Sequence, residues 1–229
     1  MFKNNLPSRV LVFSAHQDDE TIGCGGFLHR LSLSGSICKI VFMTDGSTGI
    51  SQDLEYQNII REQRKNEAEA AAQILGVAFT EYLDYSCQNL CNDQEIFHRT
   101  INIIRDFKPN LVITHSDKDK HRDHRMTCDI VKESCWKASE NIHNELGLPH
   151  RVDDVWSMEI TDLISPDFVV DISESFLYKD QAMKEYVSQS NVIPAVYEQI
   201  DFLSSLRGKQ VGVLRGEGFS RISMEAVLI

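Results

Sequence analysis

Short runs of β-branched and other apolar residues alternate along this chain with longer stretches of helical spacing, and this alternation limits the fold more than any other feature. Residues 9–15 (RVLVFSA) predict a buried strand, and residues 21–34 predict a helix. Residues 38–44 (CKIVFMT) predict a second strand, followed by a long helix over residues 53–75 that ends at Gly76. Repeated strand–helix units of this kind are typical of a parallel sheet covered by helices.

The same pattern continues through the rest of the chain. Further strands are predicted over residues 79–83, 111–114, 155–160 and 168–171, and further helices over residues 93–107, 122–136, 173–188 and 196–206. No internal repeat, low-complexity tract or linker interrupts the pattern. We therefore predict that residues 1–229 form a single Rossmann-like α/β domain, with a mostly parallel twisted sheet flanked by helices.

The charge balance excludes some classes of partner. The chain contains 23 Lys and Arg residues and 34 Asp and Glu residues, so its net charge is −11. The sequence contains no cluster of basic residues. Such a chain is poorly suited to bind nucleic acid or anionic membranes. No apolar run is long enough for a membrane span, and the first is too short for a signal peptide. We expect a cytoplasmic homo-oligomer that acts on a small molecule.

The six cysteines are scattered and contain no CxxC pair. In a cytoplasmic protein they are expected to be reduced and mostly packed as small apolar residues. Cys87 and Cys91 lie close together in sequence, but no second pair completes a structural zinc site.

Polar side chains cluster directly after two of the predicted strands. His16, Asp18 and Asp19 follow the first strand, and residues 116–124 (SDKDKHRDH) follow the strand over 111–114. Ligands bind outside the carboxyl ends of the strands in open α/β sheets, so the two loops are expected to meet at that edge. Imidazole and carboxylate groups with an open position for water make a divalent-metal site.

Each of these features also has a simpler interpretation. A single His-x-x-Asp or His-x-Asp-His is common in solvated loops, but the two together at one sheet edge are hard to obtain by chance. Gly23, Gly25 and Gly26 resemble a dinucleotide-binding loop, yet the third glycine of that motif is missing and the acids before it would repel a pyrophosphate. We interpret these glycines as room for close helix packing.

The sequence resembles the LmbE/PIG-L family of zinc-dependent N-acetylglucosaminyl deacetylases. The resemblance rests on residues 15–26 (AHQDDETIGCGG), 44–46 (TDG), 121–124 (HRDH), 171–173 (DIS) and 216–219 (GEGF), and it covers nearly the whole chain. The late segments look most like the bacterial branch that includes the deacetylases of bacillithiol biosynthesis and their chitooligosaccharide-acting relatives.

The resemblance implies a role for each of several residues. It makes His16, Asp19 and His124 the ligands of one zinc ion per chain, with Fe²⁺ as the alternative metal. It makes Asp18 the general base and His121 the cationic group that faces the oxyanion. The chemistry is consistent, because two adjacent aspartates cannot point at the metal in the same way, and the second can then take a proton from the bound water.

The resemblance also implies that Asp123 orients His121, and that Arg64 and Tyr197 contact the substrate, an N-acetylated amino sugar. Two positions depart from the family pattern. Gln17 stands where relatives have Pro or a small residue, and Cys87 stands where relatives have a sugar-contacting Asp. Either Asp84 replaces that Asp from a shifted loop or the sugar pocket differs here.

Two other functions compete with deacetylation. Two histidines and one carboxylate also form the facial triad of non-haem iron oxygenases, although those enzymes usually have all-β double-sheet folds. A metal-binding protein without catalysis is the third possibility, but such a protein would not need Asp18, His121 or Asp123.

Overall fold

The computed structural model describes residues 6–47, 54–190, 192 and 195–222. Its strands are β1 (Arg9–Ser14), β2 (Ile37–Thr44), β3 (Phe79–Tyr85), β4 (Leu111–Thr114), β5 (Asp154–Met158), β6 (Phe168–Asp171) and β7 (Gly216–Arg221). Its helices are α1 (Asp19–Leu33), α2 (Leu54–Leu75), α3 (Gln94–Phe107), α4 (Arg122–Ala138), α5 (Phe176–Glu185), α6 (Val187–Ser190) and α7 (Val196–Val211), with a short 3₁₀ helix η1 (Asn144–Leu146).

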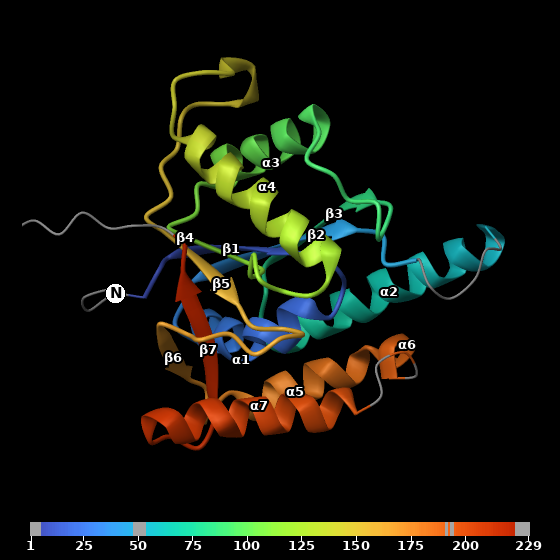
Figure 1. Ribbon diagram of the computed structural model, residues 1–229, viewed down its shortest axis with the longest axis vertical. Coiled ribbons are helices and arrows are strands. Elements are labelled where there is room, and N and C mark those ends of the chain that lie inside the picture. The colour runs from blue at the N-terminus through green and yellow to red at the C-terminus, as the bar shows by residue number, and fades with distance from the viewer. Residues whose placement is uncertain (1–5, 48–53, 191, 193–194, 223–229) are drawn as a thin grey trace, which may run out of the picture.

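One seven-stranded sheet organises these elements, in the order β3-β2-β1-β4-β5-β7-β6 (Figure 1). The first five strands in this order pair in parallel, whereas β7 is antiparallel to both of its neighbours. The prediction of an α/β fold with a mostly parallel sheet is therefore confirmed. The chain runs outward from β1 to β3 and then returns to β4 on the other side of β1, so the strand order reverses between β1 and β4.

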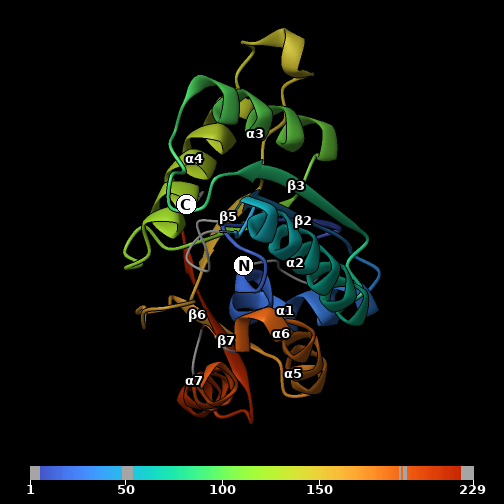
Figure 2. The same cartoon turned by 90° about the vertical axis from the view of Figure 1, so that its right-hand side faces the viewer.

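Helices cover both faces of the sheet, as Figures 1 and 2 show. Alternate residues of β1 point to opposite faces: Val10 and Val12 join the core under α1 and α2, and Leu11 and Phe13 join the core under α3 and α4. All four side chains are fully buried. Burial on both faces explains why the strand is a continuous apolar run rather than an alternating one.

Strand β7 was not predicted. Its sequence, GEGFSR, contains two glycines and shows no apolar alternation, so its β-propensity is low. The strand forms because it fills the antiparallel position between β5 and β6, where Phe219 is fully buried and packs with Trp156 and Phe27. Tertiary packing overrides the local preference here.

The helix predicted over residues 173–188 is interrupted. Tyr186 has a non-helical backbone (φ −80°, ψ 58°) and separates α5 from α6. Its side chain is completely buried, and its hydroxyl donates a 2.6 Å hydrogen bond to Glu20 Oε1. The interruption therefore places Tyr186, from the C-terminal part of the chain, against Glu20 in the first turn of α1.

Helix α1 also contains a break, at Cys24 (φ −145°, ψ 16°). A Cβ atom at Gly23 would lie 2.7 Å from Ile160 Cδ1, and one at Gly26 would lie 2.8 Å from Ile172 Cβ. Side chains at these positions would clash with the neighbouring elements. The interpretation of the glycines as room for close packing is confirmed for Gly23 and Gly26, whereas a Cβ atom at Gly25 would make only ordinary contacts, the nearest at 3.4 Å from Lys179 Cγ.

A buried ion pair satisfies the backbone groups that the break leaves free. Lys179 Nζ donates to the carbonyl of Ile22 at 2.7 Å, and the Glu217 carboxylate accepts from the amides of Gly26 and Phe27 at 2.9 and 2.8 Å. Lys179 and Glu217 also contact each other at 2.7 Å. Helix ends need such partners when they are buried, so this pair fixes the course of α1 from the far end of the chain.

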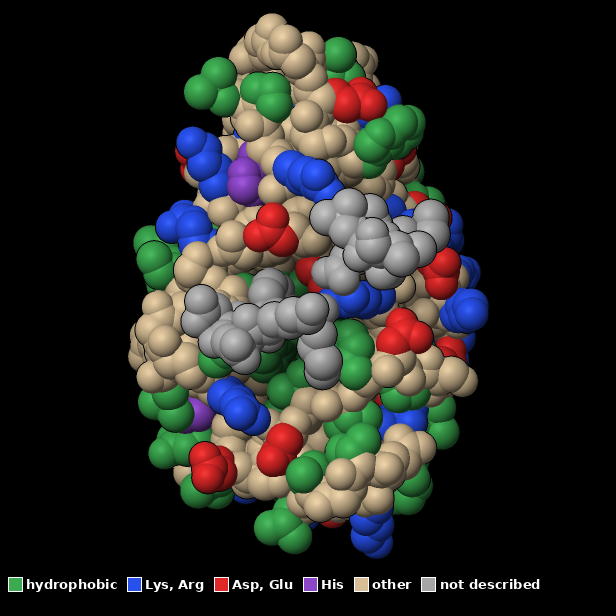
Figure 3. Space-filling model, turned by 90° about the vertical axis from the view of Figure 1, so that its left-hand side faces the viewer, with side chains coloured by type: hydrophobic (Ala, Val, Ile, Leu, Met, Phe, Trp, Pro, Cys, Tyr) green, Lys and Arg blue, Asp and Glu red, His purple; other side chains and the backbone are tan. Residues whose placement is uncertain are grey.

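All six cysteines are free thiols, and five of them are buried, with Cys91 exposed. In the part of the chain that the structure describes, no helix has the length and apolar character needed to cross a membrane. On the face shown in Figure 3, Lys and Arg side chains are interspersed with acidic and apolar ones rather than forming a continuous basic patch.

Candidate metal centre and active site

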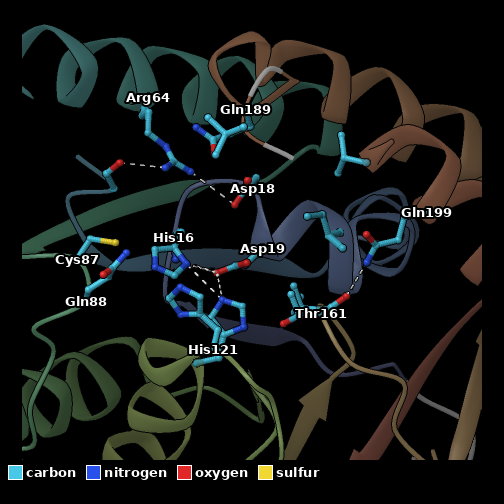
Figure 4. Close-up of a pocket in the computed structure, with 16 residues that line it drawn as sticks. His16, Asp18, Asp19, Arg64, Cys87, Gln88, His121, Thr161, Gln189 and Gln199 are labelled. Carbon is cyan, nitrogen blue, oxygen red and sulfur yellow. Dashed lines mark hydrogen bonds and ion pairs between the residues drawn. The ribbon is translucent and has the colours of Figure 1, made fainter. Parts of the chain in front are cut away.

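A pocket opens at the carboxyl ends of β1 and β4, where the strand order reverses. Six of the eight predicted site residues line it: His16, Asp18, Asp19, Arg64, His121 and His124. The rest of its wall includes Cys87, Gln88, Thr161, Gln189 and Gln199 together with apolar side chains (Figure 4). The sheet topology therefore brings the two loops together as predicted.

The loop after β1 is held in a strained conformation. Asp18 has a φ of 135°, a value that residues with a side chain rarely adopt. Arg64 Nη2 donates to the carbonyl of Gln17 at 2.6 Å, and the amide of Asp18 donates to Glu20 Oε2 at 3.1 Å. Such strain persists only where surrounding contacts enforce it, and it is concentrated at functional sites.

Three possible metal ligands converge at one point. His16 Nδ1 lies 3.1 Å from Asp19 Oδ2, and His124 Nε2 lies 3.3 Å from each of these atoms. Ligands that bind zinc at about 2.0–2.2 Å in tetrahedral geometry lie roughly 3.3 Å apart. The three donors fit a single divalent ion, in the combination that the sequence resemblance implied.

A second carboxylate lies behind each of the two histidines. The other ring nitrogen of His16, Nε2, is 3.2 Å from Asp123 Oδ2, and Nδ1 of His124 is 3.1 Å from Asp119 Oδ2. Metal-binding histidines usually have such a partner, which fixes the ring and increases its basicity. The sequence analysis missed Asp119, although its place in the acidic loop before His121 was a usable signal.

Asp119 joins three parts of the site. Besides its contact with His124, its Oδ1 accepts from the amide of His121 at 2.8 Å and from Thr161 Oγ1 at 2.5 Å. The carboxylate therefore links the candidate ligand His124, the loop before α4 and the loop after β5.

His115 is the second residue that the sequence analysis missed. It is completely buried and stacks on His124 with a ring separation of 4.2 Å. Its Nε2 accepts a 2.8 Å hydrogen bond from the amide of Ala15, which ties the end of β4 to the end of β1. Burial lowers the pKa of His115 well below its usual value, so the ring is neutral and can accept that bond.

The charges of the cluster bear on whether it could hold a metal ion. Burial lowers the pKa of His124, but Asp19 and Asp119 outweigh that effect and raise it to about 9. Burial raises the pKa of Asp19, but His124 and His16 hold it well below its usual value. Without a metal the histidines therefore hold protons beside the carboxylate, and metal binding would replace those protons.

Asp18 lies beside this cluster and has a different environment. Burial raises the pKa of Asp18 to about 7, although the Arg64 guanidinium, 3.6 Å away, opposes the rise. A carboxylate with a pKa near neutrality is suited to take and return a proton. Two adjacent aspartates thus occupy distinct environments, as general-base and ligand roles require.

The contacts of His121 and Asp123 differ from those of the side-chain pair that the sequence analysis expected. The Asp123 carboxylate contacts His16 and accepts from the amide of Gln88 at 2.6 Å. Nδ1 of His121 instead accepts the backbone N–H of Asp123 at 3.2 Å and caps α4. Burial lowers the pKa of His121, and the nearby His16 and His124 rings lower it further. The lowered pKa and the N–H accepted at Nδ1 both favour a neutral ring that carries its proton on Nε2.

The two predicted substrate contacts are placed differently. Arg64 lines the pocket, but it also donates to the carbonyls of Gln17 and Gly46 and so holds the loops after β1 and β2. Tyr197 is not among the described residues that line the pocket. It packs against the apolar core, whereas its neighbour Val196 lines the cavity.

The position of Cys87 distinguishes between the two alternatives for the sugar pocket. Cys87 is buried and lines the cavity. Asp84 is exposed, lies at the end of β3 and forms an ion pair with Lys65 at 3.0 Å. Asp84 therefore does not supply a carboxylate to this wall of the pocket, where Cys87 lies instead.

Comparison with known proteins identifies the family. The family model "GlcNAc-PI de-N-acetylase" (PIG-L) matches residues 11–135, more than half of the chain. The chain therefore belongs to the PIG-L family, a family of N-deacetylases, and the resemblance seen in the sequence is confirmed.

Two relatives and one solved structure show the range of this likeness. The chain is 28% identical to the diacetylchitobiose deacetylase of Thermococcus kodakarensis. The alignment spans 200 residues and covers 82% of this chain and 74% of the relative. It is 29% identical over 137 residues to the 4-oxalmesaconate hydratase of Pseudomonas putida, over 57% and 53% of the two chains. The structure of N,N'-diacetylchitobiose deacetylase from Pyrococcus horikoshii superposes with a TM-score of 0.84 at 25% identity, covering 96% of this chain and 85% of the other.

Replacement of Asp119 tests the contact behind His124. In Asp119→Asn the ring would lose its charged partner, so we expect metal affinity to fall by about 10- to 100-fold. Competition with a chromophoric chelator measures this affinity. Asp117→Asn is the matched control, because Asp117 is exposed and pairs with Lys132 outside the pocket. Equal affinities in the two variants would contradict the positioning role of Asp119.

Proposed function

We propose that this protein is a metal-dependent hydrolase that removes the acetyl group from an N-acetylated amino sugar or its conjugate. One observation carries the proposal: three converging donors lie beside a buried carboxylate of raised pKa, in the wall of one pocket. Membership of a deacetylase family and the likeness to two diacetylchitobiose deacetylases support the amino-sugar substrate.

The residues present fit a zinc ion held by His16, Asp19 and His124. Such an ion would polarise the amide carbonyl and lower the pKa of a bound water toward 7. Asp123 and Asp119 hold the two ligand rings in place from behind. The chain's own residues would carry out the remaining steps.

Asp18 is the general base in this proposal. It takes a proton from the attacking water as the new C–O bond forms, and it returns a proton to the nitrogen as the C–N bond breaks. Water and the amide are thereby converted to acetate and a free amine. The Nε2–H group of His121 would donate to the oxyanion of the tetrahedral intermediate, a role that a neutral imidazole can fill.

Hydration of a carbon–carbon double bond is the second candidate. A relative that shares 29% identity is named 4-oxalmesaconate hydratase. Water addition could use the same base and the same metal ligands, but it releases no acetate. The oxygenase alternative lacks support, because the sheet is a mostly parallel α/β sheet rather than an all-β double sheet.

A substrate panel tests the two candidates. We expect acetate release from N-acetylglucosamine or N,N'-diacetylchitobiose. Removal of the metal with a chelator should abolish this release, and addition of zinc should restore it. Conversion of 4-oxalmesaconate without any acetate release across the panel would favour the hydratase.

The two adjacent aspartates should have separable effects. Asp18→Asn keeps the ligand set, so we expect normal zinc content and a fall in kcat of about 10²–10⁴, the usual contribution of a positioned general base. Asp19→Ala removes a ligand, so zinc content should fall as well. Elemental analysis and steady-state kinetics on the same preparations measure both effects. Equal zinc loss in the two variants would refute this division of roles.

Arg64 should control the acid limb of the pH profile. Ionised Asp18 is required, so kcat/KM should rise with pH as Asp18 loses its proton. Because Arg64 opposes the raised pKa of Asp18, Arg64→Gln should move this limb to higher pH. Arg61→Gln is the control on the same helix, since Arg61 pairs with Asp45 rather than with Asp18. If the acid limb of the kcat/KM profile lies at the same pH in both variants and in the wild type, Arg64 does not set the pKa of Asp18.

A further inference from the structure

We propose that the pocket contains a second metal site, formed by His16 Nε2, Cys87 Sγ and the Asp123 carboxylate, which binds a thiophilic ion such as excess Zn²⁺ or Cd²⁺ and inhibits the enzyme. The site shares His16 with the proposed catalytic metal, and to that extent it rests on the proposed function. Its donors are otherwise different.

The three donors lie together on one side of the His16 ring. Their ligand atoms are within 4.8 Å of one another, and all three residues are buried. His16 Nδ1 faces Asp19 and His124, whereas Nε2 faces Asp123. Figure 4 shows Cys87 on the side of the ring opposite to Asp19. The two nitrogens of one imidazole therefore face two separate groups of donors.

Asp123 has an oxygen available for a cation. Its Oδ2 contacts His16 and the amide of Gln88, but its Oδ1 is buried without a hydrogen-bond partner among the described residues. A buried carboxylate oxygen without a partner is energetically costly, and a cation would satisfy it. Cys87 is 6% exposed and lines the pocket, so an ion can reach the thiol from that side.

Each of the two other groups of donors in the described structure shares two members with the proposed catalytic site, whereas the group with Cys87 shares only His16. Asp19, His115 and His124 form one group, but His115 Nε2 already accepts the amide of Ala15. His16, His121 and His124 form the other, and it draws on His16 and His124, the two histidines of the proposed catalytic site. In the group with Cys87, neither Cys87 nor Asp123 is a ligand of the proposed catalytic metal.

The donor types select the ion. Thiolate, imidazole and carboxylate are all zinc ligands, and a thiolate disfavours Mg²⁺ and Ca²⁺. Zinc would need donor atoms roughly 3.3–3.7 Å apart; His16 Nε2 and Asp123 Oδ2 are already 3.2 Å apart, and small side-chain shifts would bring the remaining donors into range. The thiol proton and the Nε2 proton would leave to solvent, and the resulting imidazolate would bind one ion through each nitrogen. Inhibition follows because His16 loses the Asp123 contact that fixes its ring.

An optical titration with Cd²⁺ tests the proposal. Metal-free protein receives increasing Cd²⁺ while ultraviolet absorption reports thiolate-to-metal charge transfer. The first equivalent should bind without this band, because the catalytic donors include no sulfur. The band should then grow with the second equivalent. Cys87→Ser should bind the first equivalent and lose the band, whereas Cys91→Ser, a change at the exposed cysteine, should retain both.

Zinc inhibition supplies a second measurement. The zinc concentration that halves activity should rise by at least about tenfold in Cys87→Ser and stay unchanged in Cys91→Ser. Absence of the band in the wild type, its persistence in Cys87→Ser, or its appearance with the first equivalent would each overturn the proposal. The titration does not depend on a substrate, so its outcome remains separate from a failure of the proposed deacetylation.

Discussion

The parallel pairing of β1 with β4 is the constraint on which the rest of this structure depends. The two strands lie side by side although about 100 residues separate them, and their carboxyl ends deliver His16, Asp19 and His124 to one point. The hydrogen bond from the amide of Ala15 to His115 ties the two ends together. Because both strands are buried on both faces, neither end can shift without disturbing the core.

Charge burial explains most of the contacts around the pocket. A buried charge is tolerated only when it is paired and hydrogen-bonded, and this chain buries several near the β1–α1 loop. Asp119, Asp123 and Arg64 each make contacts to more than one neighbour. The same contacts that satisfy these charges also orient the metal donors and set the pKa of Asp18, so stability and reactivity have a common physical origin.

The fold was largely predictable because its signal is local. Parallel strands buried on both faces, such as β1 and β4, appear as continuous apolar runs. The other predicted strands, including the less buried β3, were located from shorter runs in their βα context. Strand β7 and the interruption at Tyr186 escaped because their causes lie in distant residues: Phe219 occupies an aromatic cluster, and Tyr186 reaches Glu20 across the chain. Cys24 likewise breaks α1 because Lys179 and Glu217 stabilise the break.

The sequence by itself determined the parallel α/β architecture, the two loops that carry the chemistry and the identity of the three converging donors. The adjacency of Asp18 and Asp19 also indicated two separate roles. Only the tertiary structure decided which carboxylate stands behind which histidine, that the Asp123 carboxylate contacts the His16 ring, and that burial lowers the pKa of His121. Periodicity and spacing report the local backbone, whereas hydrogen-bond partners and desolvation depend on which distant segments pack together.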